Sequence, residues 1–409
     1  MTELTVSHLG AHGDGVATHD GRAVYLPFGA PGDRFQLADD GTPRLLVEGD
    51  NRQTPPCGHF GTCGGCRMQH LAPDLYRDWK RDLIRLPLER AGIDLPEMAP
   101  TAESPPGSRR RARFAARRRA NGTVLGFNEA RSRRIVPLEA CPVLQPELQA
   151  LLPALAKLCD GLLRPGRTLD LQLTASDGGV DLVLHGLREP GLKQRERLGI
   201  WAVEQDIARL SASPDERRPP EVLLARRDPL LRWSDTSLVP PPGGFLQATR
   251  EGERALQDFI TRHLTGARTI VDLYAGCGTL SLAARRHGRV HAVDGHAESL
   301  TALDHAARRS PGRPVSVETR DLARRPLLRD ELKRYEAAIV DPPRAGARAQ
   351  AELLADAALE RIVMVSCNPT TFARDAALLL AGGFRLTELQ PVDQFLWSPH
   401  MELAALFRR

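Results

Sequence analysis

The C-terminal part of the chain, residues 241–409, alternates short apolar runs with helical stretches. The predicted strands are TIVDLYAG, RVHAVDG, VSVETRD, AAIVDPP and RIVMVSC. Nearly continuous β-branched strands separated by helices are typical of a parallel, doubly wound sheet with both faces covered. The pattern therefore predicts one α/β domain of ordinary size at this end of the chain.

The first 50 residues follow a different pattern of short alternating segments rich in glycine. LTVSHLG, GVATHDGRAVYLP and DRFQLA read as strands, and Asp20-Gly21 lies where a tight turn would join two of them. Strands of this length with Asp-Gly and Pro-Gly turns are typical of a small β-barrel.

Helical periodicity dominates the segment that follows residue 68, where Tyr76, Trp79, Leu83 and Leu86 recur on one predicted face. Residues 100–240 mix strands such as LDLQLTAS with helices such as LQALLPALAKLC. Cys159 belongs to that last apolar helix, and we expect it in a core.

Composition fits a soluble globular protein, with 42% hydrophobic and 26% charged residues among 409. The N-terminus carries no basic stretch followed by an apolar run, and no segment approaches the roughly 18 apolar residues of a membrane span. We expect a cytoplasmic protein, monomeric and without membrane contact.

The charge is concentrated in one segment. The net charge is +5, and nearly all the cationic residues are arginines, a bias that a GC-rich genome would also produce. Residues 109–134, however, hold ten arginines and one acid, with the turn signal Asn121-Gly122 near the middle. This pattern predicts a basic β-hairpin that contacts polyphosphate, and a merely solvated face is the alternative.

Three cysteines cluster in PPCGHFGTCGGCRMQH, where Cys57, Cys63 and Cys66 have a C-x5-C-x2-C spacing. An intracellular chain keeps its thiols reduced, so we do not expect disulfides. The interleaved glycines allow the tight turns by which several thiolates converge on one centre. Cys141, which precedes a proline in EACPVLQP, is the best candidate for a fourth ligand.

Four thiolates suit either zinc or an iron–sulfur cluster. Zinc ribbons carry two C-x2-C knuckles and this chain has one, so the spacing favours a [4Fe–4S] cluster. His59 and His70 flank the loop, and we interpret them as bystanders.

Cys367 ends the apolar run RIVMVSC and is followed at once by Asn-Pro. The proline stops the strand, so the sulfur lies at a strand end, where ligands collect in α/β sheets. It is therefore either a nucleophile or a buried structural thiol, and we favour the nucleophile.

A glycine turn follows the first strand of the α/β domain. Gly276 and Gly278 form a G-x-G, but Ser281 stands where a dinucleotide fingerprint needs a third glycine. Asp294 ends the next strand and Asp321 follows the third, in positions suited to ribose and base. A nucleoside cofactor without pyrophosphate fits this pattern, namely S-adenosylmethionine.

Several motifs together resemble the RNA uracil-C5 methyltransferases, and more closely their iron–sulfur, TRAM-domain branch that modifies ribosomal RNA. They are the four-cysteine pattern, GGFLQ, DLYAGCGTL, DPPRAG, SCNP and HME, and they extend over nearly the whole chain. Asp294 stands where a glutamate is more usual, and FLWSPHME departs from the commoner stretch before the last motif.

The resemblance implies which residues form the catalytic, cofactor-binding and cluster-binding sites. Cys367 would be the nucleophile, Glu402 the base that removes the C5 proton, and Asp341 would serve both catalysis and cofactor binding. The implied S-adenosylmethionine positions are Gln247, Tyr274, Gly276, Gly278, Thr279, Asp294, Asp321 and Asp341. The implied ligands of the [4Fe–4S] cluster are Cys57, Cys63, Cys66 and Cys141.

The resemblance also implies a fold class, α/β, with a Rossmann-like class I methyltransferase domain at 241–409. It adds a TRAM-like or OB-like β-barrel at 1–50, a central α+β iron–sulfur domain at 51–68 and 99–240, and a helical segment at 69–98 packing on the catalytic domain.

The implied partner is RNA, most simply 23S ribosomal RNA. Two alternatives stay open: a transfer RNA uridine methyltransferase, and a non-catalytic, zinc-bound RNA-binding protein.

Overall fold

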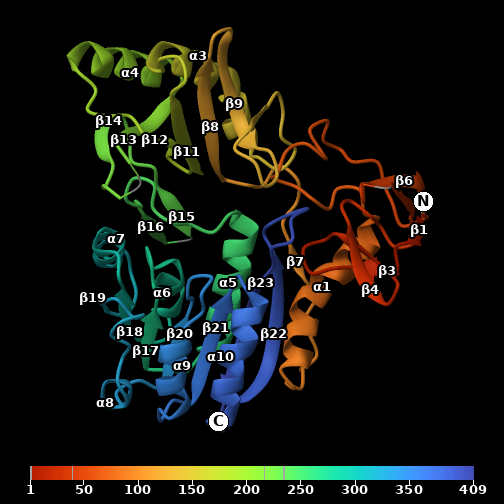
Figure 1. The fold of residues 1–409 in the computed structure, drawn as a ribbon. Helices are drawn as coiled ribbons and strands as arrows, with labels where there is room; N and C mark the ends of the chain where they lie inside the picture. Colours follow the sequence, from red (N-terminus) through yellow and green to blue (C-terminus); the bar gives the residue numbers. More distant parts are fainter. Residues whose placement is uncertain (1, 39, 216, 234) are drawn as a thin grey trace.

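The computed structural model describes residues 2–38, 40–215, 217–233 and 235–409. Figure 1 shows three groups of strands along the chain: a small N-terminal group, a central sheet with helices α3 and α4 above it, and a larger C-terminal sheet. No helix within the described residues has the length and apolar character needed to cross a membrane.

The N-terminal strands form two three-stranded sheets with the orders β1-β5-β6 and β2-β3-β4. Their bounds are β1 Thr2–Thr5, β2 His8–Leu9, β3 Gly15–His19, β4 Arg22–Leu26, β5 Arg34–Leu37 and β6 Pro43–Val47. Asp20 and Gly21 both have positive φ and join β3 to β4, as the tight turn requires. The predicted strands are thus present, and β6 is an additional one.

The central sheet has seven strands in the order β10-β9-β8-β11-β12-β13-β14. Their bounds are β8 Arg111–Arg119, β9 Gly122–Asn128, β10 Ile135–Pro137, β11 Thr168–Ser176, β12 Gly179–His185, β13 Ile207–Ser213 and β14 Glu221–Ala225. Strands β8 and β9 are the predicted basic hairpin, although Arg119 pairs with Gly122 and the turn therefore falls at residues 120–121, one position earlier than predicted.

Helices on this central sheet are α2 Pro146–Ala150, α3 Leu152–Leu162 and α4 Leu192–Glu204. Cys159 on α3 is fully buried among leucines, which confirms its expected place in a core. A two-stranded sheet, β15 Leu231–Trp233 with β16 Thr236–Leu238, leads toward the C-terminal sheet.

The C-terminal sheet has eight strands in the order β19-β18-β17-β20-β21-β23-β22-β7. Their bounds are β7 Ala102–Glu103, β17 Thr269–Leu273, β18 Arg289–Asp294, β19 Val315–Thr319, β20 Ala337–Val340, β21 Arg361–Ser366, β22 Arg385–Asp393 and β23 Glu402–Arg408. The five predicted strands, β17 to β21, are parallel, but β23 is antiparallel to both β21 and β22. The predicted strands thus form the parallel part of a mixed sheet, and the antiparallel β23 was not predicted.

Helices cover both faces of this sheet (Figure 1). Their bounds are α1 Pro73–Arg90, α5 Arg250–His263, α6 Thr279–Ala284, α7 Ala297–Arg309, α8 Arg329–Leu332, α9 Arg348–Ala355 and α10 Pro369–Ala381. The core under α1, α8, α9 and α10 is separate from the cores under α5, α6 and α7. This is the doubly wound arrangement, and it leaves the carboxyl ends of the parallel strands open.

Helix α1 packs on the C-terminal sheet through Ile84 and Leu88. Leu86, predicted on its buried face, is exposed, whereas Lys80 is buried. The Lys80 Nζ lies 2.7 Å from Asp393 Oδ1, and the Tyr76 hydroxyl donates to Asp393 Oδ2 at 2.6 Å. These buried partners hold the end of β22 against α1.

A second buried ion pair joins the central sheet to the C-terminal one. Arg110, just before β8, donates through Nη2 to Glu253 Oε2 on α5 at 2.6 Å, and both side chains are almost wholly buried. Trp233 Nε1 also donates to Glu253, at 2.7 Å.

Replacing Arg110 with methionine should lower the free energy of unfolding by about 3–5 kcal/mol, because Glu253 would be left as an uncompensated buried charge. Arg117→Met, an exposed arginine of the same hairpin, should change it by less than about 0.5 kcal/mol. Urea unfolding of both variants checks this, and equal losses would mean that the buried pair has no special role.

Candidate active site

The predicted cofactor turn lies at the carboxyl edge of the C-terminal sheet, directly after β17. Parallel neighbours β18 and β20 flank β17, so the strand order reverses here, as at the ligand-binding crevice of other open α/β sheets. Tyr274, Gly276 and Gly278 all have positive φ. A Cβ added to Gly278 would lie 2.3 Å from Leu303 on α7, so this turn requires glycine for packing as well as for its backbone.

The two predicted ribose and base carboxylates lie at the same edge. Asp294 ends β18, and its Oδ2 accepts a hydrogen bond from Gly276 N at 2.9 Å while Oδ1 accepts from His296 N at 2.7 Å. Asp321 follows β19, is exposed, and accepts from Ala323 N. Asp294 therefore braces the glycine turn, a role that sequence reasoning did not assign to it.

Asp272 is a buried carboxyl that sequence reasoning missed. It lies within β17, is fully buried, and accepts a hydrogen bond from the Ser281 hydroxyl at 2.5 Å. Burial raises its pKa to about 7. The available signal was an acid inside the apolar run TIVDL, facing the position where a dinucleotide fingerprint would have glycine.

Cys367 lies at a strand end, as predicted. It follows β21 directly, and the Asn368 side chain caps α10 by accepting from Thr370 N at 3.1 Å. The thiol is half-buried. Burial raises its pKa, the nearby carboxyls of Glu402 and Asp341 raise it further, and the Arg344 guanidinium lowers it.

The structure brings Glu402 and Asp341 to the same place as Cys367. Glu402 opens β23, beside β21, and is buried. Burial and the Asp341 carboxyl raise its pKa to about 8. Asp341 follows β20, where burial and Asp294 raise its pKa to about 7. Three groups that are negative when ionised thus lie together at the ends of the neighbouring strands β20, β21 and β23.

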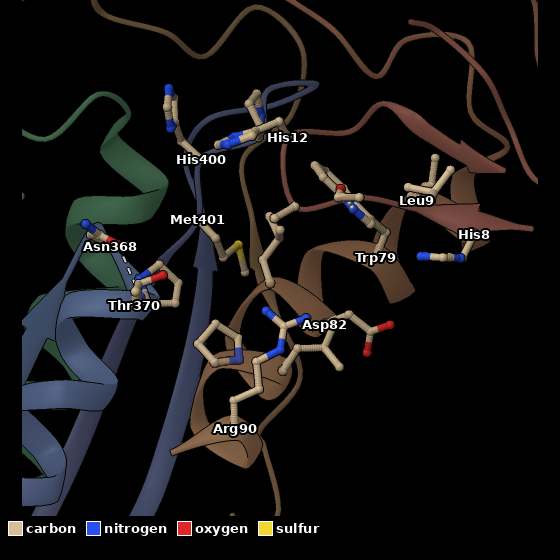
Figure 2. Close-up of a pocket in the computed structure, with 18 of the residues that line it drawn as sticks. His8, Leu9, His12, Trp79, Asp82, Arg90, Asn368, Thr370, His400 and Met401 are labelled. Atoms are coloured by element: carbon tan, nitrogen blue, oxygen red, sulfur yellow. Dashed lines mark hydrogen bonds between the residues drawn. The ribbon is translucent and has the colours of Figure 1, made fainter. Parts of the chain in front are cut away.

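A cavity of about 790 Å³ opens onto Cys367. Its walls come from the N-terminal strands with His12 and Tyr25, from α1 with Trp79, and from the stretch that ends in His400. Figure 2 shows His12 and His400 in the upper part of the view, with Asn368 and Thr370 across from α1. The cavity is therefore built from segments near both ends of the sequence.

The four predicted cysteine ligands line a second cavity, of about 300 Å³, together with Gln69 and Arg109. Burial raises the pKa of the Cys66 thiol to about 12. His59 also lines this cavity, whereas His70 packs against Phe28 and Phe60.

Within the ranges the structure describes, no group of three or more His, Cys, Asp or Glu side chains is placed to hold a metal ion. The predicted cluster site is therefore seen only as four thiols around one cavity.

The arginines of residues 109–134 differ in exposure. Arg110 is buried in its ion pair, and Arg111 donates to Leu246 O at 2.7 Å and lies over the Phe245 ring. Those two make contacts within the protein, which corrects the prediction for this part of the segment. Arg109 and Arg118 are half-buried, and they contact Arg111 O and Asp160. The exposed members are Arg113, Arg117, Arg119, Arg131, Arg133 and Arg134.

The five parallel strands, the glycine turn at the switch point and the acids at the strand ends define the chain as a class I, S-adenosylmethionine-dependent methyltransferase fold. A solved structure shares the fold over its full length: the tRNA (uracil-54, C5)-methyltransferase of Pyrococcus abyssi in complex with S-adenosyl-L-homocysteine, with a TM-score of 0.74 and 22% identity, covering 99% of this chain and 100% of that one.

The sequence comparisons identify the family. Residues 317–409 match the family model of tRNA (Uracil-5-)-methyltransferase. An uncharacterized RNA methyltransferase of Agrobacterium fabrum is 40% identical over 99% of both chains. The 23S rRNA (uracil(1939)-C(5))-methyltransferase RlmD of Halomonas elongata is 33% identical over 98% of this chain and 88% of its own length. The chain belongs to the RNA uracil-5-methyltransferase family, and it is an enzyme.

Alkylation of Cys367 should require a higher pH than that of an ordinary thiol, since burial and the two carboxyls raise its pKa. Arg344→Gln should slow alkylation further at a given pH, because the guanidinium whose charge lowers the pKa of Cys367 is removed. Mapping of the Cys367 peptide after iodoacetamide treatment measures this. Arg348→Gln, an exposed arginine on α9, is the matched control, and an equal effect of both substitutions would contradict the electrostatic account.

Proposed function

We propose that this enzyme methylates C5 of uridine in RNA, with Cys367 as nucleophile and Glu402 as base. The observation that carries the proposal is the convergence of Cys367, Glu402 and Asp341 at the strand ends beside the glycine turn, with a cavity opening onto the thiol.

The chemistry explains why a thiol and a carboxylate are needed together. The Cys367 thiolate adds to C6 of uracil and makes C5 nucleophilic. S-adenosylmethionine, when bound, would supply a methyl group on a positively charged sulfur, and transfer of that methyl to C5 would break the S–C bond and leave S-adenosylhomocysteine. Glu402 then removes the C5 proton, and the electron pair expels the Cys367 thiolate by β-elimination. Cysteine suits both halves of the cycle because it is a strong nucleophile and a good leaving group.

The residues that would hold the cofactor surround the glycine turn. Asp294 and Asp321 would bind the nucleoside, and Tyr274, Gly276, Gly278 and Thr279 would form the turn around it. Gln247 and Asp341 would line its inner side. The fit is supported by the shared strand edge and by Asp294, which already orders the turn through Gly276 N.

Ribosomal RNA is the substrate class that the sequence relatives favour, because the Halomonas elongata enzyme acts on 23S rRNA. The target uridine must leave its stack for the thiol to reach C6, so a loop or a flipped base is expected. Residues 1–50, as a TRAM-like barrel, would contact RNA at the cavity rim, and the exposed hairpin arginines would contact phosphates. Transfer RNA is the alternative substrate.

The four cysteines support a second part of the proposal, a [4Fe–4S] cluster held by residues of the central part of the chain, 51–68 and 99–240. Cys57, Cys63, Cys66 and Cys141 share one cavity although Cys141 is distant in sequence. Such a cluster would hold the loop 57–66 against Cys141 and β9. Zinc is the alternative occupant, and absorption near about 400 nm would distinguish the two.

Glu402→Gln tests the mechanism. Cys367 should still add and the methyl should still transfer, but the C5 proton would stay, so a covalent protein–RNA adduct should accumulate and survive denaturing electrophoresis. The adduct should require both RNA and S-adenosylmethionine.

Cys367→Ala should abolish adduct and turnover together while cofactor binding persists, and the double variant should behave like Cys367→Ala. Parental turnover by Glu402→Gln without adduct would show that Glu402 is not the base. Absence of turnover in the parent on any RNA would favour a non-catalytic RNA-binding protein.

Cys141→Ser should lower iron content and bleach the protein, because one of four ligands is lost. Cys159→Ser is the matched control, since that thiol is buried on α3 apart from the cavity. Iron analysis and visible absorption of anaerobically purified protein measure both. Equal iron in the Cys141 variant and the parent would disprove the four-ligand assignment.

A further inference from the structure

Gln394 lies where the cofactor side and the base side of the site meet. It follows β22 and is buried. Its Nε2 donates to Gln247 Oε1 at 2.6 Å and also to Glu402 Oε2, and its Oε1 accepts from Ala248 N at 2.7 Å. One side chain thus contacts the base and the segment that carries a predicted cofactor residue.

The orientation of this amide is fixed by its partners. Both N–H groups are used on oxygen acceptors, and the carbonyl is used on a backbone N–H. A flipped amide would place its oxygen against the Glu402 carboxylate and its NH₂ against Ala248 N–H, which are both repulsive. Gln394 therefore presents a donor to Glu402 in every arrangement that keeps these contacts.

The backbone at Gln394 is also restrained. Its neighbour Asp393 is held by Lys80 and Tyr76 of α1. On the other side α5 approaches so closely that a Cβ added to Gly252 would lie 2.8 Å from the Gln394 Cβ. The amide has little freedom to follow Glu402 if the carboxylate moves, so the carboxylate must take its position from the amide.

We propose that Gln394 is the positioning residue of Glu402. Its amide orients the Glu402 carboxylate toward the C5 proton and stabilises the ionised form that accepts this proton. The same amide fixes the position of the carboxylate relative to the Gln247 segment. This inference rests on the proposed function, and it goes beyond that function because neither the motifs nor the comparisons give Gln394 a role.

The charged surroundings of Glu402 make such a donor necessary. Asp341 at the end of β20 and Cys367 after β21 face it as groups that are negative when ionised. The cations nearby are engaged elsewhere: Lys80 with Asp393, and Arg344 with His400. Among these groups, the amide of Gln394 is the one that donates directly to the carboxylate, and a hydrogen bond to the charged form favours that form.

Gln394→Met keeps the length of the side chain and removes the donor. Decay of the covalent adduct follows thiol addition, so it reports proton removal without the titration of Cys367. Rapid-quench assays with RNA tritiated at uridine C5 would follow adduct decay and tritium release across pH. In the plot of decay rate against pH, the rising limb should shift to higher pH by about one unit in the variant. The reason is that Glu402 loses a hydrogen bond that favours its ionised form.

Tyr76→Phe is the control for a purely structural effect, since it removes the hydroxyl bonds to Asp393 and to Trp397 N on the same stretch. It should slow decay equally at all pH values and leave the limb in place. If Gln394→Met does not fold, Gln394→Glu preserves the shape and should move the limb further, since two carboxyls would then share one proton.

A limb that stays at the parental pH in the folded Gln394 variant would overturn the proposal. Failure of the proposed function looks different: the parent itself would form no adduct and release no tritium.

Discussion

The site depends on one constraint: Cys367, Asp341 and Glu402 must be brought together although each is negative when ionised. Burial raises the pKa of all three, and neighbouring carboxyls raise each further: Asp294 acts on Asp341, Asp341 acts on Glu402, and both Glu402 and Asp341 act on Cys367. The three groups therefore tend to be protonated, and a positive charge placed beside them would favour their ionised forms. A sulfonium cofactor would supply that charge beside the carboxylates. Bringing these groups together is electrostatically unfavourable, so the backbone that carries them must be held in place by other buried contacts.

Two buried ion pairs provide that support. Lys80 holds Asp393 at the end of β22, and Arg110 holds Glu253 on α5. Buried pairs contribute little net stability compared with apolar substitutes, but they permit few alternative geometries. Both pairs join segments that are distant in sequence, so they set the position of the C-terminal strands relative to α1 and to the central sheet.

Elements whose pattern is local could be predicted from the sequence. Apolar runs predicted β17 to β21, the Asp20-Gly21 turn was correct, and motifs placed Cys367 and Glu402, which the structure brings together. Features that depend on residues distant in the sequence could not be predicted. Strands β22 and β23 were not predicted, and Arg110 was assigned to a polyphosphate-binding hairpin although it is buried against Glu253. The burial of Lys80 becomes clear only when Asp393 is placed beside it. Gln394 and Asp272 gain their roles only from the side chains that surround them.

The bond between Tyr76 and Asp393 joins residues 317 positions apart. During synthesis, α1 leaves the ribosome long before β22, which carries Asp393. Lys80 therefore stays hydrated while the residues between α1 and Asp393 are made. Closing so long a loop is slow, and nascent domains generally form from the N-terminus onward. The candidate active site is therefore completed only after β22 and β23 have been made, because Asp393 ends β22 and Glu402 opens β23.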